Sequence, residues 1–285
     1  MTRWLVTGAG GQLGTDVMAV LGAQGADAHG FDRATFDITD PDAVGATLSA
    51  VAPTVVVNCA AYTAVDAAEA DESTATVVNG QAPGHLAQWC AAHRARFIQV
   101  STDYVFAGDA TTPYDVDHPT DPRSAYGRSK LAGERATLAA GGDAHVVRTA
   151  WVYGATGANF VKTIARLSGE QETLRVVDDQ IGSPTWSLQL ATALVALGVA
   201  AVEPGIWHCS GAGQTSWYGL AGAIFSELGL DPARITPTTT AEFPRPAPRP
   251  AYSVLSNRKW LAADLPALPP WRDALHEALA LGLVG

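Results

Sequence analysis

Short apolar runs alternate with longer amphipathic stretches through the first two-thirds of the chain. The apolar runs are continuous in Val, Ile, Leu and Phe, which is typical of parallel strands buried on both faces. The stretches between them have the length and spacing of helices. The sequence therefore predicts strands over Arg3–Thr7, Ala28–Phe31, Thr54–Asn58, Arg96–Val100, His145–Thr149 and Leu174–Val177, and helices over Leu13–Gly22, Asp42–Val51, Gln81–His93 and Ser124–Leu138.

Repeated strand–helix units of this size predict an α/β fold with a Rossmann-type doubly wound parallel sheet. The pattern loosens after about residue 205, where we expect helices over Trp217–Leu228 and Trp271–Leu281 and an ordered loop over the Pro-rich segment Pro237–Pro250. Residues 1–150 would form the Rossmann domain, with residues 174–204 returning to it. Residues 151–173 and 205–285 would form a smaller mixed α/β C-terminal region that binds the substrate.

Composition narrows the functional classes. The 285 residues carry a formal net charge of −10, which argues against nucleic-acid binding. No apolar run is long enough to span a bilayer, and the first predicted strand starts so early that no room is left for a signal peptide. The three cysteines, Cys59, Cys90 and Cys209, show no paired spacing. We therefore expect a cytoplasmic protein that binds neither nucleic acid nor membrane.

A glycine turn joins the first predicted strand to the first predicted helix. Gly8, Gly11 and Gly14 are spaced G-x-x-G-x-x-G. Glycine allows a sharp turn and leaves space for a diphosphate at the helix N-terminus. The alternative is a tight turn without a ligand, but the strand before it and the helix after it favour a dinucleotide site.

The end of the second predicted strand bears on the choice between NAD and NADP. Asp32 could bind the hydroxyls of an adenosine ribose, whereas Arg33 could bind the additional phosphate of NADP or be a solvated turn residue. Asp37 could contact the adenine or cap the next helix. The pattern leaves NADPH and NADH both open as cofactors.

Residues suited to proton transfer follow the fourth predicted strand. Thr102 stands at the end of that strand, and Tyr126 and Lys130 stand four residues apart at the start of the next helix. Residues four apart share a helix face, so the phenol and the ammonium can point into one site. A nearby cation lowers the pKa of a tyrosine, and the lysine can also hold a nicotinamide ribose. Thr102 would add a hydrogen bond to the substrate oxygen, and the arrangement favours carbonyl reduction.

Together these motifs resemble the extended short-chain dehydrogenase/reductases, and within them the dTDP-4-dehydrorhamnose reductase family. Matching stretches run nearly end to end: GGQLG, NCAAYTAVDAAE, STDYVFAG, YGRSKLAGE, RTAWVYG, NFVKTIARL, VVDDQIGSPT and PRPAYSVL. The resemblance implies an oxidoreductase of dTDP-rhamnose biosynthesis that uses NADPH or NADH. Its substrate would be a dTDP-4-keto-6-deoxysugar, above all dTDP-4-dehydro-L-rhamnose, with hydride passing to ring carbon 4 while Tyr126 donates the proton.

The resemblance also implies a role for each motif residue. The catalytic group would be Thr102, Asp103, Tyr126 and Lys130. The cofactor would be bound by Gly8, Gly11, Gln12 and Leu13 at the diphosphate, by Asp37 and Ile38 near the adenine, and by Ala60, Ala61 and Thr63 at the nicotinamide, in addition to Asp32, Arg33, Tyr126 and Lys130. The substrate would be bound by Thr102, Asp103, Tyr104 and Trp151, with Asn159 and Arg249 as candidates for the nucleotide–sugar end.

Two other functions fit the same motifs. A related antibiotic-sugar reductase, such as a dihydrostreptose synthase or another dTDP-4-ketohexose reductase, would share the cofactor and the ketone chemistry. A non-catalytic NADP-binding regulatory subunit would share the fold, although the intact Tyr126–Lys130 pair argues against a loss of catalysis.

A departure from the resembled family concerns metal binding. Some members bind magnesium at a dimer contact through two glutamates, and the matching positions here are Asp16 and Leu188. Leucine cannot ligate a hard cation. We therefore expect no bound metal and a monomer or weak homodimer.

Some residues also have ordinary structural interpretations. We expect Trp186, Trp207 and Trp217 in the core and Asp66 in the first turn of a helix. Arg249 could be a solvated loop residue if it binds no diphosphate.

Overall fold

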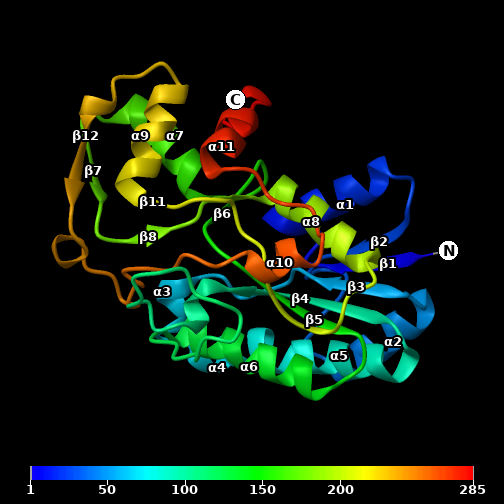
Figure 1. The fold of residues 1–285 in the computed structure, drawn as a ribbon. Coiled ribbons are helices and arrows are strands. Elements are labelled where there is room, and N and C mark those ends of the chain that lie inside the picture. The colour runs from blue at the N-terminus through cyan, green and yellow to red at the C-terminus, as the bar shows by residue number, and fades with distance from the viewer. Residues whose placement is uncertain (1, 285) are drawn as a thin grey trace.

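A central sheet of six parallel strands organises the computed structural model, which describes residues 2–284 (Figure 1). The strands lie in the order β10-β5-β4-β3-β1-β2. The order reverses between β1 and β3, which is where open α/β sheets bind ligands beyond the strand carboxyl ends. Their bounds are β1 Arg3–Thr7, β2 Asp27–Phe31, β3 Val55–Asn58, β4 Arg96–Thr102, β5 Ala144–Thr149 and β10 Gly205–His208.

Helices cover both faces of the sheet (Figure 1). On β1, Trp4 and Val6 pack into the core beneath α1 and α8, whereas Leu5 packs into the opposite core beneath α2 and α5. Both faces are buried, which explains why the strand is apolar at consecutive positions. The covering helices are α1 Gln12–Ala23 and α8 Ser187–Val199 on one side, and α2 Pro41–Val51, α5 Ala82–His93 and α6 Ala125–Ala139 on the other.

A π-helical turn over Val77–Gln81 joins α4, Glu72–Thr76, to α5 without a break. Asn79 in this turn donates to the Tyr62 carbonyl at 3.0 Å and to Ser129 Oγ at 3.0 Å, and its Oδ1 accepts from the Tyr62 N–H at 2.8 Å. The loop after β3 is thereby fixed to α6. The short helix α3, Val65–Ala68, lies in the same connection and carries Asp66 in its first turn, as predicted.

A second, smaller body with its own core packs beside the sheet, at the upper left in Figure 1. Its helices are α7 Phe160–Glu170, α9 Trp217–Glu227 and α11 Trp271–Ala280, and the short helix α10 Arg258–Ala262 lies by β10. Short strand pairs complete it: β7 Leu174–Val177 with β12 Ile235–Thr238, β8 Ile181–Gly182 with β11 Thr215–Ser216, and β6 Val152–Tyr153 with β9 Thr185–Trp186.

Every predicted strand forms, but one of them has a different partner from the one expected. Leu174–Val177 pairs with β12 instead of joining the central sheet. The sixth place in the central sheet is taken by β10, which we expected in the C-terminal region. Burial explains the difference, because Arg175 is exposed in the middle of β7 while Trp207 and His208 of β10 are buried. The division of the chain into a cofactor-binding and a substrate-binding region stays a prediction.

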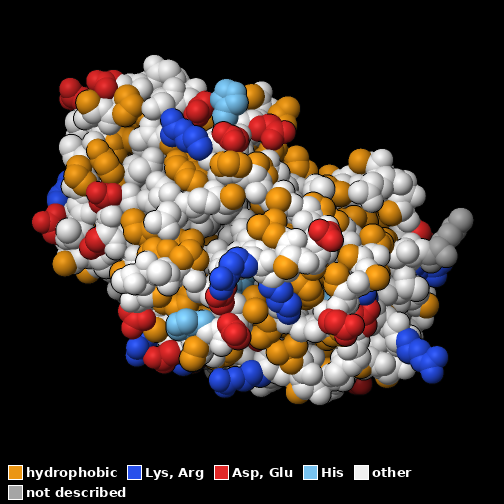
Figure 2. Space-filling view, in the orientation of Figure 1, with side chains coloured by type: hydrophobic (Ala, Val, Ile, Leu, Met, Phe, Trp, Pro, Cys, Tyr) orange, Lys and Arg blue, Asp and Glu red, His pale blue; other side chains and the backbone are white. Residues whose placement is uncertain are grey.

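Within residues 2–284, no helix combines the length and the apolar character that crossing a membrane requires. On the face in Figure 2, Lys and Arg side chains lie singly among acidic and apolar ones.

Candidate active site

A cavity of ≈ 1190 Å³ opens at the carboxyl ends of the central strands. Its wall comes from the loops after β1, β2, β3, β4 and β5 and from the start of α6, with Trp217 contributed by the second body. The cavity collects most residues predicted for the site: Gly8, Gly11, Gln12, Leu13, Asp32, Arg33, Asp37, Ile38, Ala60, Ala61, Thr63, Thr102, Asp103, Tyr104, Tyr126, Lys130 and Trp151.

The glycine turn forms one end of this cavity. Gly8 has a left-handed backbone, with φ +64°, and its carbonyl accepts from the Gly11 N–H at 2.9 Å. A Cβ on Gly14 would lie 2.1 Å from that carbonyl oxygen, so only glycine lets α1 approach the turn this closely. No side chain caps α1. Its first backbone N–H groups therefore remain available for an anion.

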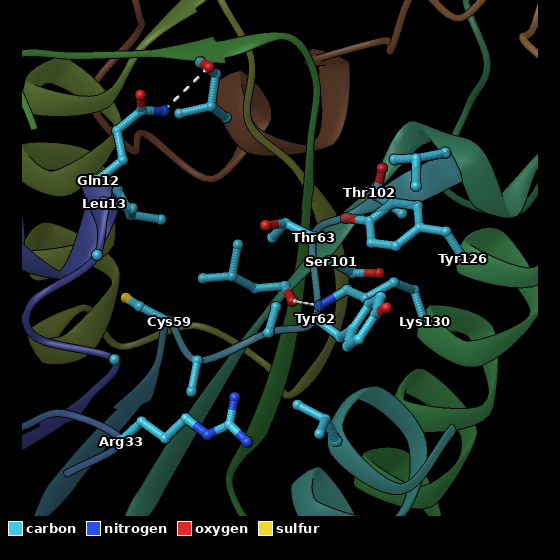
Figure 3. A pocket seen from close by; sticks show the side chains of 18 of the residues that line it. Gln12, Leu13, Arg33, Cys59, Tyr62, Thr63, Ser101, Thr102, Tyr126 and Lys130 are labelled. Atoms are coloured by element: carbon cyan, nitrogen blue, oxygen red, sulfur yellow. Dashed lines mark hydrogen bonds between the residues drawn. The ribbon is translucent and has the colours of Figure 1, made fainter. Parts of the chain in front are cut away.

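The loops after β2 form the side of the cavity where an adenosine would lie. The Thr35 hydroxyl donates to Asp32 Oδ1 at 2.9 Å and, with neighbouring N–H groups, keeps the pKa of that carboxyl low. Thr39 likewise donates to Asp37 and lowers its pKa. Asp40, and not Asp37, caps α2. The exposed Arg33 side chain extends into the cavity in Figure 3.

Tyr126 is placed by the start of α6. Ser124 caps this helix by accepting from the Gly127 N–H at 3.1 Å. A Cβ on Gly127 would lie 2.3 Å from the Tyr104 carbonyl oxygen, so the glycine lets the helix start close to the loop after β4. The rings of Tyr104 and Tyr126 pack edge to face at 5.6 Å. The Tyr126 hydroxyl points toward Thr102 (Figure 3).

Thr102 and Asp103 form a buried pair behind that hydroxyl. Thr102 Oγ1 donates to Asp103 Oδ1 at 2.8 Å, so its proton points away from the place we expected for the substrate oxygen. Asp103 Oδ2 is buried and has no partner of good geometry within the described residues, although Ser253 lies near enough to lower the pKa of the carboxyl. Burial nevertheless raises the pKa of Asp103 to about 6.

Lys130 lies one helical turn after Tyr126 and is buried. Its Nζ donates to the Val100 carbonyl at 2.7 Å (Figure 3). Burial lowers the pKa of Lys130 to about 8. We expected this ammonium to lower the pKa of Tyr126; instead, burial and then the Asp103 carboxylate raise the pKa of the phenol. The phenol is therefore protonated at neutral pH and is suited to act as an acid.

An aromatic pair forms one wall of the cavity. Trp151 and Trp217 stack with ring centroids 3.5 Å apart and an interplanar angle of 4°. We placed Trp217 in the core with Trp186 and Trp207; those two are buried, but Trp217 is only partly buried and lines the cavity. The contact joins residues 66 positions apart, which no local pattern could reveal. Sequence reasoning also missed Cys59, Tyr62, Val77 and Val78 in the wall.

Two predicted substrate-binding residues have structural partners and do not line the cavity. Asn159 caps α7 by accepting from the Lys162 N–H at 3.0 Å, and its Nδ2 donates to Gln12 Oε1 at 3.0 Å. Arg249 pairs with Asp66 at 2.9 Å, which ties the Pro-rich loop to α3. Both residues therefore have positioning contacts within the protein, and their substrate contacts stay a prediction.

The two positions matched to a magnesium site are already occupied by protein contacts. Asp16 accepts a hydrogen bond from Ser187 Oγ, and Leu188 packs against the core of the second body. No group of three or more potential metal ligands occurs among residues 2–284.

Comparison with known proteins agrees with this geometry. The family model described as RmlD substrate binding domain matches residues 2–283. The dTDP-4-dehydrorhamnose reductase of Streptomyces griseus is 50% identical over 281 residues, which cover 97% of this chain and 92% of that protein. A Streptomyces antibioticus protein named probable dTDP-4,6-dihydroxy-2-methyloxan-3-one 4-ketoreductase is 49% identical over 277 residues, covering 97% and 94%.

Similarity extends to solved structures. The crystal structure of dTDP-4-dehydrorhamnose reductase from Bacillus anthracis in complex with NADP matches with a TM-score of 0.94 and 35% identity, covering 99% of this chain and 100% of that one. The Rossmann-type fold class and the resemblance predicted from the sequence are thereby confirmed. The chain belongs to the RmlD family of dTDP-4-dehydrorhamnose reductases, which are NAD(P)-dependent oxidoreductases.

Proposed function

We propose that this protein uses NADPH or NADH to reduce the 4-keto group of a dTDP-4-keto-6-deoxysugar, above all dTDP-4-dehydro-L-rhamnose to dTDP-L-rhamnose. The observation that carries the proposal is the meeting of Tyr126 and Lys130 with the glycine turn in one cavity. The names of the relatives at 50% and 35% identity support the same substrate class.

The residues present fit a dinucleotide. The close contact of Gly14 with the Gly8 carbonyl and the uncapped start of α1 leave backbone N–H groups for a diphosphate. Arg33 would face the phosphate on an NADP ribose, and Lys130 would hold the other ribose. When bound, the nicotinamide supplies the hydride for ring carbon 4.

The remaining chemistry belongs to the protein. Tyr126 donates its proton to the carbonyl oxygen as the ketone becomes an alcohol, and the phenolate then regains a proton from solvent. Thr102 orients the oxygen if its hydroxyl turns from Asp103 to the substrate. The stacked Trp151 and Trp217 exclude water from the sugar side.

A reductase acting on another dTDP-4-ketosugar is the second candidate. The 49% identity to the Streptomyces antibioticus protein named as a probable 4-ketoreductase favours it. Both candidate reactions would use the same residues at the ketone. Their substrates differ in the other ring substituents, which the cavity wall must accept.

The test is oxidation of NADPH and NADH by the purified protein with a panel of dTDP-4-ketosugars. We expect the highest kcat/KM with dTDP-4-dehydrorhamnose. A higher value with a different ketosugar would select the second candidate. Cofactor binding without oxidation of any panel member would contradict both and would indicate a regulatory subunit.

We further propose a cytoplasmic location and a monomer or weak homodimer. All three cysteines are free, which suits a reducing compartment. Leu188 removes a ligand position from the metal contact that accompanies dimers in the resembled family.

A further inference from the structure

A buried carboxylate lies behind the proton-transfer pair. Glu134 follows Lys130 by four residues on α6, so the two side chains share one helix face with Tyr126. The Glu134 side chain is only 2% exposed. It accepts two hydrogen bonds from Arg148, at 2.8 and 2.7 Å, and one from Ser101 Oγ at 2.6 Å.

Arg148 fixes this carboxylate in place. The guanidinium comes from β5 and is itself fully buried. It also donates to the Val116 carbonyl at 3.3 Å and to His208 Nε2 at 3.4 Å, and lies over the Phe106 ring. A buried ion pair of this kind contributes little net stability, because both ions lose their hydration. Its place beside the site therefore calls for a functional explanation.

The surroundings of Lys130 supply that explanation. Burial destabilises the ammonium, and the Val100 carbonyl that accepts from it carries only a partial charge. Cys59, directly after β3, is near enough to act on Lys130, but burial raises the pKa of its thiol to about 12, so the thiol is neutral. Asp103, after β4, acts on Tyr126. Glu134 is the anion that acts on Lys130.

We propose, on the basis of the function above, that Glu134 is a positioning residue whose fixed buried carboxylate keeps the Lys130 ammonium charged beside Tyr126 and the cofactor. The carboxylate offsets part of the cost of burying the ammonium. The two hydrogen bonds from Arg148 hold the carboxylate on this face of α6.

The test is Glu134→Gln, which keeps the size and an acceptor for Ser101 but removes the charge. NADPH affinity without sugar, and kcat with sugar, are measured from pH 6 to pH 9. Lys130 should then lose its proton at lower pH, so the alkaline limb of both profiles should move down by about one pH unit or more. Both values should be near native at pH 6 and about fivefold lower at pH 8, or lower still if the shift exceeds one pH unit.

Ser101→Ala is the matched control, since it removes one hydrogen bond to Glu134 and keeps the charge. Its alkaline limb should stay in place. If Glu134→Gln does not fold, Glu134→Gln/Arg148→Met replaces the whole pair by neutral groups. Removing the Arg148 charge as well offsets part of the effect, so the double variant should show a smaller movement in the same downward direction.

The proposal would be overturned if a folded variant without the carboxylate kept the alkaline limb of its pH profiles at the native pH. It would also be overturned if Ser101→Ala moved that limb as far as Glu134→Gln does. NADPH affinity is measured without sugar, so a wrong sugar assignment would alter kcat alone and leave this readout intact.

Discussion

The three buried side chains around the proton-transfer site owe their shifted pKa values mainly to burial. Burial raises the pKa of Tyr126 and brings that of Asp103 up to about 6, and it lowers that of Lys130 to about 8. Asp103 and Lys130 therefore both titrate near neutrality, where each can change its charge under working conditions. Tyr126 stays protonated through this range, as its role as acid requires.

Tyr126→Phe tests that role directly. The change removes the transferable proton and keeps the ring that packs against Tyr104. Turnover should fall by roughly 10²- to 10⁴-fold, while NADPH affinity and thermal stability stay near native. Tyr153→Phe is the control, because that buried hydroxyl has no hydrogen-bond partner within the described residues. Near-native turnover of the Tyr126 variant would show that another group supplies the proton.

Arg33→Ala tests the choice of cofactor. The guanidinium extends into the cavity near Asp37, where it can meet the extra phosphate of NADPH. We expect NADPH affinity to fall by about tenfold and NADH affinity to stay unchanged. Fluorescence titration of both cofactors measures this, with Arg135→Ala on the exposed side of α6 as the control. Equal losses for NADPH and NADH would place Arg33 away from the phosphate.

Residue types and short spacings predicted the glycine turn and the Tyr126–Lys130 pair in the cavity wall, because each lies within a single loop or helix turn. The family resemblance added Ala60, Ala61 and Thr63. Trp217 and the role of Asn159 could not be predicted in this way. Their contacts, to Trp151 and Gln12, cross between distant segments. Such contacts depend on how the second body packs against the sheet, which leaves no local pattern in the sequence.

At the scale of elements, the junction of β1 with α1 depends on how closely α1 can approach the glycine turn. Gly14→Ala would place a Cβ 2.1 Å from the Gly8 carbonyl oxygen, so α1 must shift. The free energy of unfolding should fall by about 1–3 kcal/mol, and NADPH affinity should fall with it.

A matched substitution in the same helix checks this prediction. A Cβ on Gly22 would meet nothing within 4 Å. Gly22→Ala should therefore raise the free energy of unfolding by about 0.5–1 kcal/mol without changing NADPH affinity. Denaturant unfolding and cofactor titration measure both variants. A Gly14→Ala protein as stable as the wild type would contradict the close-packing argument.

Strand and helix positions followed from the hydrophobic pattern to within a few residues, since burial on both faces leaves a continuous apolar run. The hydrophobic pattern did not predict which strands pair with each other. Leu174–Val177 reads as a buried strand, yet Arg175 faces solvent in it, and its partner β12 lies about 60 residues further along the chain. The four residues of β10 are too few, and contain too polar a residue in His208, to stand out from the sequence.

At the scale of the whole molecule, we predict independence from divalent metal. Asp16 is bonded to Ser187, and Leu188 is packed on the core of the second body. Activity and oligomeric state should therefore be the same with EDTA and with added magnesium, as measured by steady-state rates and by size-exclusion chromatography with light scattering. Loss of most activity under chelation, or dissociation of a stable dimer, would contradict this.

The π-helical turn at Val77–Gln81 changes the direction in which the side chains after it point around the helix axis. Such a turn holds one residue more than an α-helical turn, so everything after it is rotated by roughly 100° relative to an uninterrupted helix. At the start of the turn, Val77 and Val78 line the cavity; after it, Leu86 and Cys90 of α5 pack into the core under the sheet. Without the additional residue, one of these two sets of side chains would turn away from the surface that it covers. A single helix can thus line the ligand cavity at one end and seal the sheet at the other.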